Sequence, residues 1–245
     1  MFRAPLRRAP WLAAASVVLS LLASSCSGPQ YQYVRNTSLR TAFKVPTAWT
    51  LFDKATLLGE PPGPQASTPD PIRWLVGIDG DPAPAVQHIL NPNSLTTDYP
   101  QGVALVQQYS FDDRDSSSFR SLRDYLFPVT QLLQDPNSAQ VITYDDSIDR
   151  NGVRGVHVVF QFRASSLAAA ESSAGTTGPT DLQRALLGGE GAALLSPDYV
   201  TVDQTALVDA ATSRVYYIAV MCSAECFNRN HADIRSIVDS WTVLS

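Results

Sequence analysis

The pair Asn151-Gly152 lies between two stretches rich in β-branched and aromatic residues, and it constrains the fold of this chain more than any other feature. Asn-Gly is favoured in a two-residue turn because both central positions need a positive φ. The sequence therefore predicts a hairpin with strands over Val141–Asp149 and Val153–Arg163. In the second strand the large apolar residues alternate and share one face, which a core would bury: Val156, Val158, Phe160 and Phe162.

Further stretches have the composition of strands and are bounded by turn residues. In the stretch Val215–Met221 the residues at both odd and even positions are apolar. This is typical of a strand whose two faces are both covered. The full set of expected strands outside the hairpin is 42–45, 49–52, 72–78, 103–111, 206–209, 215–221 and 241–244.

Two segments have the spacing of amphipathic helices. From Phe119 to Leu133 the apolar residues recur at steps of three and four, and the Asp and Ser residues before Phe119 suit a helix N-terminus. Pro128 should kink this helix or end its first half. A second helix is expected over Asn228–Asp239. The order of elements predicts the α+β class, with a mostly antiparallel sheet flanked by helices.

Two segments read as loops. Residues 60–71 contain five prolines, which exclude a helix interior or a central strand. Residues 164–197 are rich in Ala, Ser and Gly, with one short helix expected around Asp181–Leu187. Loops of this length are either functional or mobile, and we expect 164–197 to be a flexible insertion.

The N-terminus has the pattern of an export signal. Arg3, Arg7 and Arg8 precede an uncharged run of 13 residues, Trp11–Ala23. As a helix this run is about 20 Å long, which is short of the ~30 Å needed to span a bilayer core. It therefore fits a signal peptide over residues 1–25.

Leu22-Ala23-Ser24-Ser25-Cys26 resembles the lipobox of bacterial lipoproteins. The resemblance implies cleavage before Cys26 and attachment of a diacylglyceryl group to its thiol, with the membrane as a partner. The sequence departs from the family pattern at Ala23, where Leu is commoner. The alternative is an ordinary secretory signal that is cut nearby, with Cys26 incidental. Residues 26–38 are then the lipidated N-terminus and a short tether, and 39–245 form a single domain.

Cleavage before Cys26 leaves 220 residues with 15 cationic and 23 acidic side chains, a formal charge of −8. An acidic chain lacks the positive surface of a general nucleic-acid binder. Such a body is not drawn to an anionic membrane by its net charge, so the lipid must anchor it. The expected location is extracytoplasmic, at the outer face of the cell membrane.

If Cys26 carries lipid, Cys222 and Cys226 remain, and an oxidising compartment permits a disulfide between them. A zinc site would need more ligands than nearby Glu225 and His231 provide. The CxxxC spacing also differs from the CxxC of thiol oxidoreductases. We expect a structural disulfide at a strand-to-helix junction.

Three features of the chain resemble the PsbP-like fold of actinobacterial LpqN-type lipoproteins. They are the opening Phe43-Lys44-Val45-Pro46-x-x-Trp49, the central helix followed by the Asn151-Gly152 hairpin, and the ending Ile234 to Val243. The resemblance implies an α/β/α sandwich. A preference for Arg (16 residues) over Lys (two) is also typical of high-GC bacteria such as actinobacteria.

The sequence indicates no catalytic site, cofactor or metal. It lacks the Gly-x-Ser-x-Gly, HExxH, Gly-rich phosphate-loop and Ser-x-x-Lys patterns. The acidic run 112–115 lacks the rest of a calcium loop and suits a helix cap. Turn geometry in the hairpin places Asp146 opposite His157 and Asp149 opposite Arg154, which predicts solvated cross-strand pairs. His88 is expected in a loop and His231 on a surface.

These observations favour a non-catalytic, lipid-anchored envelope protein that binds another protein or a glycan. The alternative is a carrier or sensor of a small apolar ligand, held in a pocket between the sheet and the helices.

Overall fold

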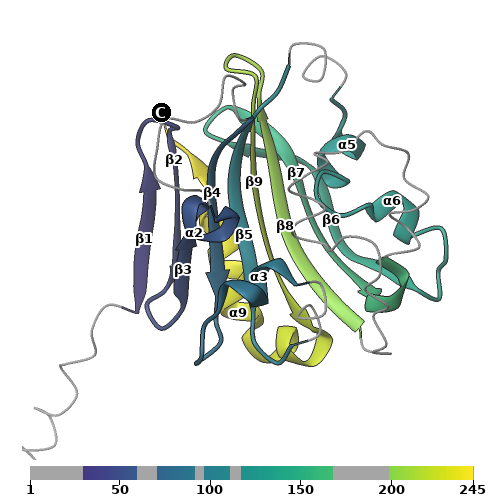
Figure 1. Cartoon of the computed structure of the whole chain (residues 1–245). Coiled ribbons are helices and arrows are strands. Elements are labelled where there is room, and N and C mark those ends of the chain that lie inside the picture. Colours follow the sequence, from purple (N-terminus) through teal and green to yellow (C-terminus); the bar gives the residue numbers. More distant parts are fainter. Residues whose placement is uncertain (1–29, 60–70, 92–96, 111–116, 168–198, 245) are drawn as a thin grey trace, which may run out of the picture.

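The computed structural model describes residues 30–59, 71–91, 97–110, 117–167 and 199–244. A seven-stranded antiparallel sheet, in the order β3-β4-β5-β9-β8-β7-β6, dominates the fold (Figure 1). Its strands are β3 (Thr50–Asp53), β4 (Ile72–Asp79), β5 (Gln101–Gln108), β6 (Ala139–Arg150), β7 (Val153–Arg163), β8 (Tyr199–Asp209) and β9 (Arg214–Ser223).

A second, three-stranded sheet has the order β1-β2-β10, with β1 (Tyr31–Asn36), β2 (Thr41–Pro46) and β10 (Thr242–Val243). The expected tether over 26–38 is wrong for residues 31–36, because they form β1. Sequence alone does not reveal this strand, since β1 buries few side chains and is held by its pairing with β2. The domain therefore begins before residue 39.

Five helices are bounded by described residues: α2 (Lys54–Leu58), α3 (Val86–Leu90), α5 (Phe119–Arg123), α6 (Val129–Leu132) and α9 (Ala224–Ser240). The expected helix over 119–133 is split into α5 and α6. Pro128 is the N-cap of α6, and its missing N–H and fixed ring end the first half, as predicted. The last helix begins at Ala224 rather than Asn228, because the Ser223 side chain caps it.

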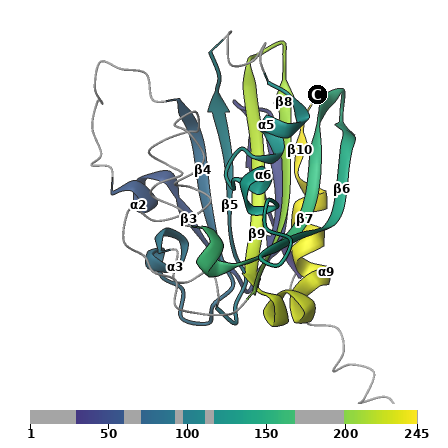
Figure 2. The same cartoon turned by 90° about the vertical axis from the view of Figure 1, so that its right-hand side faces the viewer.

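Two cores lie on opposite faces of the large sheet. One packs against α2, α3, α5 and α6, and the other against α9 and the small sheet. Figure 2 shows α9 and β10 on one side of the sheet and α2 and α3 on the other. Strand β9 contributes alternate residues to both cores, as predicted. The α+β class with helices on both faces is confirmed.

The expected loops lie almost wholly outside the described residues. Of the expected loop 60–71 the structure describes Pro71, and of the expected insertion 164–197 it describes residues 164–167. Residues 164–167 are helical, with Ala164 and Leu167 buried in the core against α5 and α6. The expected flexible insertion is therefore wrong for these four residues.

Candidate interaction surface

Strand β6 is an outermost strand of the large sheet, and its side chains are unusually exposed. Residues 140–147 are all exposed to solvent. Three large apolar side chains stand among them, with exposed fractions of 38% for Val141, 55% for Ile142 and 42% for Tyr144. Large apolar residues clustered on a surface are typical of an interaction site.

Two bulges interrupt the pairing of β6 in this exposed stretch. The register with β7 shifts between Val141 and Thr143, which leaves Ile142 without an opposed residue in that pairing. It shifts again between Asp145 and Ile148. Bulges twist an edge strand and redirect its side chains, and they hinder the addition of a further strand. The side chains of β6 are therefore better placed to bind a partner than its backbone is.

Acidic residues continue the apolar stretch along the strand. Asp145, Asp146 and Asp149 are exposed. Hydrogen bonds donated to Asp145 by the backbone and the hydroxyl of Ser147 lower the pKa of this carboxyl below its ordinary value. Asp145 therefore carries its negative charge at neutral pH. We call Val141, Ile142, Tyr144 and the three aspartates the β6 surface.

Helix α5 borders the β6 surface with cationic and aromatic side chains. The Arg123 guanidinium lies 5.7 Å from the centre of the Tyr144 ring. The Arg154 guanidinium, on β7, lies 5.9 Å from the Phe119 ring. Such contacts stabilise exposed aromatic rings by about 0.5–1 kcal/mol, so Arg123 favours the observed orientation of Tyr144.

The predicted pair of Asp146 with His157 is wrong. The bulge moves the register by one residue, so Asp145 lies opposite His157, while Asp149 opposite Arg154 is confirmed. His157 Nε2 instead lies 2.8 Å from Asp203 Oδ1, on β8. Asp203 is 2% exposed, so the imidazole satisfies a buried carboxylate. This arrangement joins two strands and indicates a structural role.

The remaining residues singled out in the sequence are dispersed. His88 belongs to α3, not to a loop, and its Nδ1 lies 2.9 Å from Asp79 Oδ2. His231 is exposed on α9, as expected. Cys26 and the acidic run 112–115 lie outside the described residues. No group of three potential metal-ligating side chains occurs in the described part of the chain.

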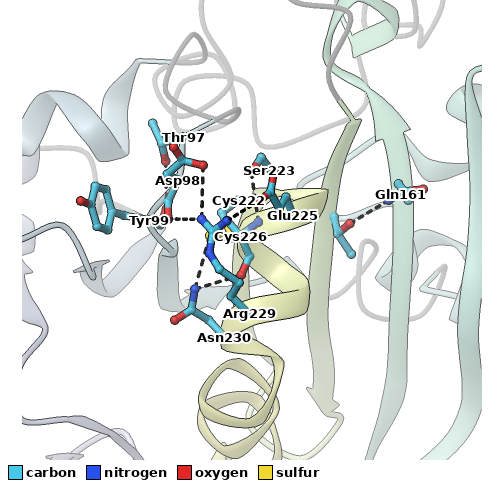
Figure 3. Close-up of a disulfide and its surroundings, with 11 residues drawn as sticks. Thr97, Asp98, Tyr99, Gln161, Cys222, Ser223, Glu225, Cys226, Arg229 and Asn230 are labelled. Atoms are coloured by element: carbon cyan, nitrogen blue, oxygen red, sulfur yellow. Dashed lines mark hydrogen bonds and ion pairs between the residues drawn. A yellow bond between two sulfur atoms is a disulfide. The ribbon is translucent and has the colours of Figure 1, made fainter.

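Cys222 and Cys226 form a disulfide where β9 meets α9, with their Cα atoms 5.9 Å apart (Figure 3). Both cysteines are buried. Arg229, one turn along the helix, contacts Glu225 at 2.9 Å and Asp98 at 3.3 Å. The bridge thus fixes the first turn of α9 to the sheet, and its surroundings indicate a structural function.

Aromatic side chains of the protein pack where the carrier alternative requires a ligand. Between the sheet and the helices, the Tyr125 ring lies 5.3 Å from Tyr217, and Phe127 lies 5.7 Å from Phe160. Burial raises the pKa of both tyrosines well above its ordinary value, so they stay neutral. The Tyr217 hydroxyl donates to Gln204 Oε1 at 2.7 Å. In this part of the described core, the aromatic side chains contact one another and the Tyr217 hydroxyl has a protein partner.

Sequence reasoning missed the β6 surface. Its signal is the loss of alternation: Val141 and Ile142 are adjacent apolar residues, and Asp145 and Asp146 are adjacent acids. A regular strand with one buried face would alternate them. The two pairs of like neighbours lie at the two bulges. The regular alternation of β7 directed attention to the partner strand, so these pairs were not interpreted.

No helix in the described part of the chain is both long and apolar enough to cross a membrane. No protein-family model and no curated protein sequence matches the chain.

Solved structures similar to the chain include the PsbP protein CyanoP of Synechocystis sp. PCC 6803, with 9% identity, 90% of this chain and 96% of that chain covered, and a TM-score of 0.41. Another is the Ran-binding protein Mog1p of Saccharomyces cerevisiae, with 9% identity, coverages of 89% and 97%, and a TM-score of 0.43. A third is LpqN, involved in cell envelope biogenesis of Mycobacterium tuberculosis, with 12% identity, coverages of 89% and 87%, and a TM-score of 0.38. At these identities and TM-scores the likenesses assign no function to the chain.

Proposed function

We propose that this chain is a non-catalytic binding module of a bacterial cell envelope. Lipid on Cys26 anchors it at the outer face of the cytoplasmic membrane, and the β6 surface holds a protein partner. The observation that carries the proposal is the exposed apolar stretch of β6 beside three exposed aspartates.

The chemistry of the β6 surface favours a protein over a glycan. Val141 and Ile142 are aliphatic and offer a sugar no hydrogen bonds, whereas a protein interface buries such side chains. The adjacent aspartates call for cationic side chains on the partner, because charge complementarity sets the register and speeds encounter. The expected partner presents apolar residues next to Lys or Arg.

The surroundings of His157 support a non-catalytic function. His157 is engaged with the buried Asp203, and Thr205, which lies opposite His157 on β8, is fully buried. The imidazole therefore has a structural partner, and the hydroxyl on the paired strand is out of contact with solvent.

The anchor is tested by replacing the lipid-bearing residue. We expect Cys26→Ser to abolish acylation, so that the variant protein carries no acyl mass, whereas the wild-type mature chain from the membrane fraction carries the mass of its acyl groups. Intact-mass measurement of wild-type and variant proteins makes the comparison. A wild-type mature chain without acyl mass would contradict the lipid anchor.

The β6 surface is tested by placing a cation in its apolar part. Tyr144→Lys should lower the amount of partner co-isolated from envelopes by about tenfold or more, because it removes apolar contact and repels a basic partner. Tyr99→Lys is the matched control, since Tyr99 is equally exposed at 42% but lies outside the β6 surface. Both variants should unfold at nearly the wild-type temperature. Equal recovery of the same proteins with the two variants would contradict the proposal.

A further inference from the structure

The hairpin of β1 and β2 has one face directed to solvent. Cross-strand pairing sets Tyr33 opposite Lys44 and Arg35 opposite Ala42. Since side chains alternate along a strand, these residues and Tyr31 share that face. Tyr33 is 80% exposed, the largest exposed fraction among the large apolar and aromatic side chains described. We call Tyr31, Tyr33, Arg35, Ala42 and Lys44 the hairpin face.

The opposite side of the same hairpin is packed. Phe43 and Val45 are 1% and 0% exposed, and Val34 packs against the core beneath α9. The hairpin is thus held rigidly by its inner side, while its outer side presents a tyrosine and cationic groups. An ordered surface of this kind needs no rearrangement to meet a flat partner.

The charge of this region differs from that of the rest of the chain. Residues 26–52 contain Arg35, Arg40 and Lys44 and no acidic residue, whereas residues 53–245 contain 12 cationic and 23 acidic residues. Asp233 of α9 contacts the hairpin face and accepts a hydrogen bond from the Tyr31 hydroxyl at 3.0 Å. Lys44 Nζ lies 4.7 Å from the centre of the Tyr31 ring.

The position of the expected anchor brings this face close to the membrane. Five residue steps separate Cys26 from Tyr31, and a fully extended chain covers at most about 18 Å in five steps. Tyrosine side chains favour the interface between lipid and water, and cationic residues are attracted to anionic headgroups. The cationic hairpin face is therefore held within reach of the bilayer. The acidic residues of the mature chain all come after it, in residues 53–245.

We propose that the hairpin face lies on the membrane as a second contact, binding anionic lipid headgroups through Arg35 and Lys44 with Tyr33 at the interface. This inference rests on the proposed lipid anchor at Cys26. It gives the domain a defined orientation instead of free rotation about a tether.

The orientation is tested in the acylated protein reconstituted into vesicles of phosphatidylglycerol and phosphatidylcholine. Tyr33→Trp should add tryptophan fluorescence that brominated lipids quench by about half, as expected for an interfacial ring. Tyr99→Trp is the matched control, and its added fluorescence should be unquenched. Vesicle-bound protein in which neither added tryptophan is quenched would overturn the proposal while leaving the anchor intact.

A second measurement separates the hairpin face from the anchor. The mature chain starting at residue 26 with Cys26→Ser is mixed with the same vesicles at low salt and sedimented. Arg35→Ala and Lys44→Ala should each weaken its partitioning about fivefold, which corresponds to about 1 kcal/mol per basic residue. The exposed Arg73 and Arg120 serve as controls, and their Ala variants should partition like the parent. Equal partitioning of all these variants would overturn the proposal even if Cys26 is acylated in cells.

Discussion

Two glycines of the β6–β7 hairpin are required for different reasons. Gly152 has a φ of +82° and follows Asn151 at +58°, which is the left-handed geometry of the tight turn. A Cβ on Gly152 would meet nothing within 4 Å. A Cβ on Gly155 would lie 2.1 Å from the Ala206 carbonyl oxygen on β8. The first position needs glycine for its backbone angle and the second for the approach of a neighbouring strand.

This difference predicts unequal costs of the same substitution. Gly152→Ala should lower the free energy of unfolding by about 1 kcal/mol, the cost of placing alanine at positive φ. Gly155→Ala should lower it by about 3 kcal/mol, because β8 must move to admit the methyl group. Urea denaturation of both variants and the wild type measures these losses. Similar losses for the two variants would be inconsistent with the close contact of β7 and β8.

At the same scale, the turn was predictable and the pairing beyond it was predictable only in part. Asn151-Gly152 fixes Asp149 opposite Arg154, the second pair from the turn. Counting pairs outward from the turn fails at His157, because the register shifts between Asp145 and Ile148. At this bulge Asp145 accepts hydrogen bonds from Ser147. Asp-x-Ser is too common a sequence to reveal this. The partner of His157, Asp203, is 46 residues away and was beyond local reasoning.

At the scale of elements, the disulfide and the cap of α9 act on the same turn. Ser223 accepts a hydrogen bond from the Cys226 amide at 3.2 Å, and the bridge ties Cys226 to the preceding strand. The helix then packs Ile234, Ile237 and Val238 on the sheet. The junction therefore positions the full length of α9.

Reduction of this disulfide should lower stability by about 2 kcal/mol, the loop-closure contribution of a five-residue ring. For a domain of this size the melting temperature should fall by about 6 °C. Calorimetry with and without reductant tests this, and a Cys222→Ala, Cys226→Ala variant should not respond to reductant. Two titratable thiols in folded, oxidised wild-type protein would rule the bridge out.

The elements themselves were recovered best where residue patterns are strong. Most strands were predicted within a few residues, because alternation and turn residues bound them. Strand β1 was missed because Tyr31, Tyr33 and Arg35 face solvent and its sequence resembles a polar linker. The helix start at Ala224 was missed because Ser223 caps the helix before its first regular apolar residue.

At the scale of the whole molecule, charge and exposed apolar surface are distributed unevenly. The cationic hairpin face belongs to the small sheet, and the acidic β6 surface belongs to an edge of the large one. Figure 1 shows β1 and β6 on opposite sides of the domain. In the proposed orientation the first meets the membrane and the second is left open for a protein. The net charge alone conceals this division, since it averages the two regions.

The central claim is that a protein partner binds the β6 surface of the anchored chain. The most direct measurement places a photoreactive amino acid at Ile142, which is 55% exposed, in the acylated protein in living cells. We expect one discrete protein adduct from Ile142 that is absent when the same group replaces Tyr99, and that disappears when Tyr144→Lys is added. Irradiation that gives the same adducts from both positions, or none from Ile142, would contradict the account.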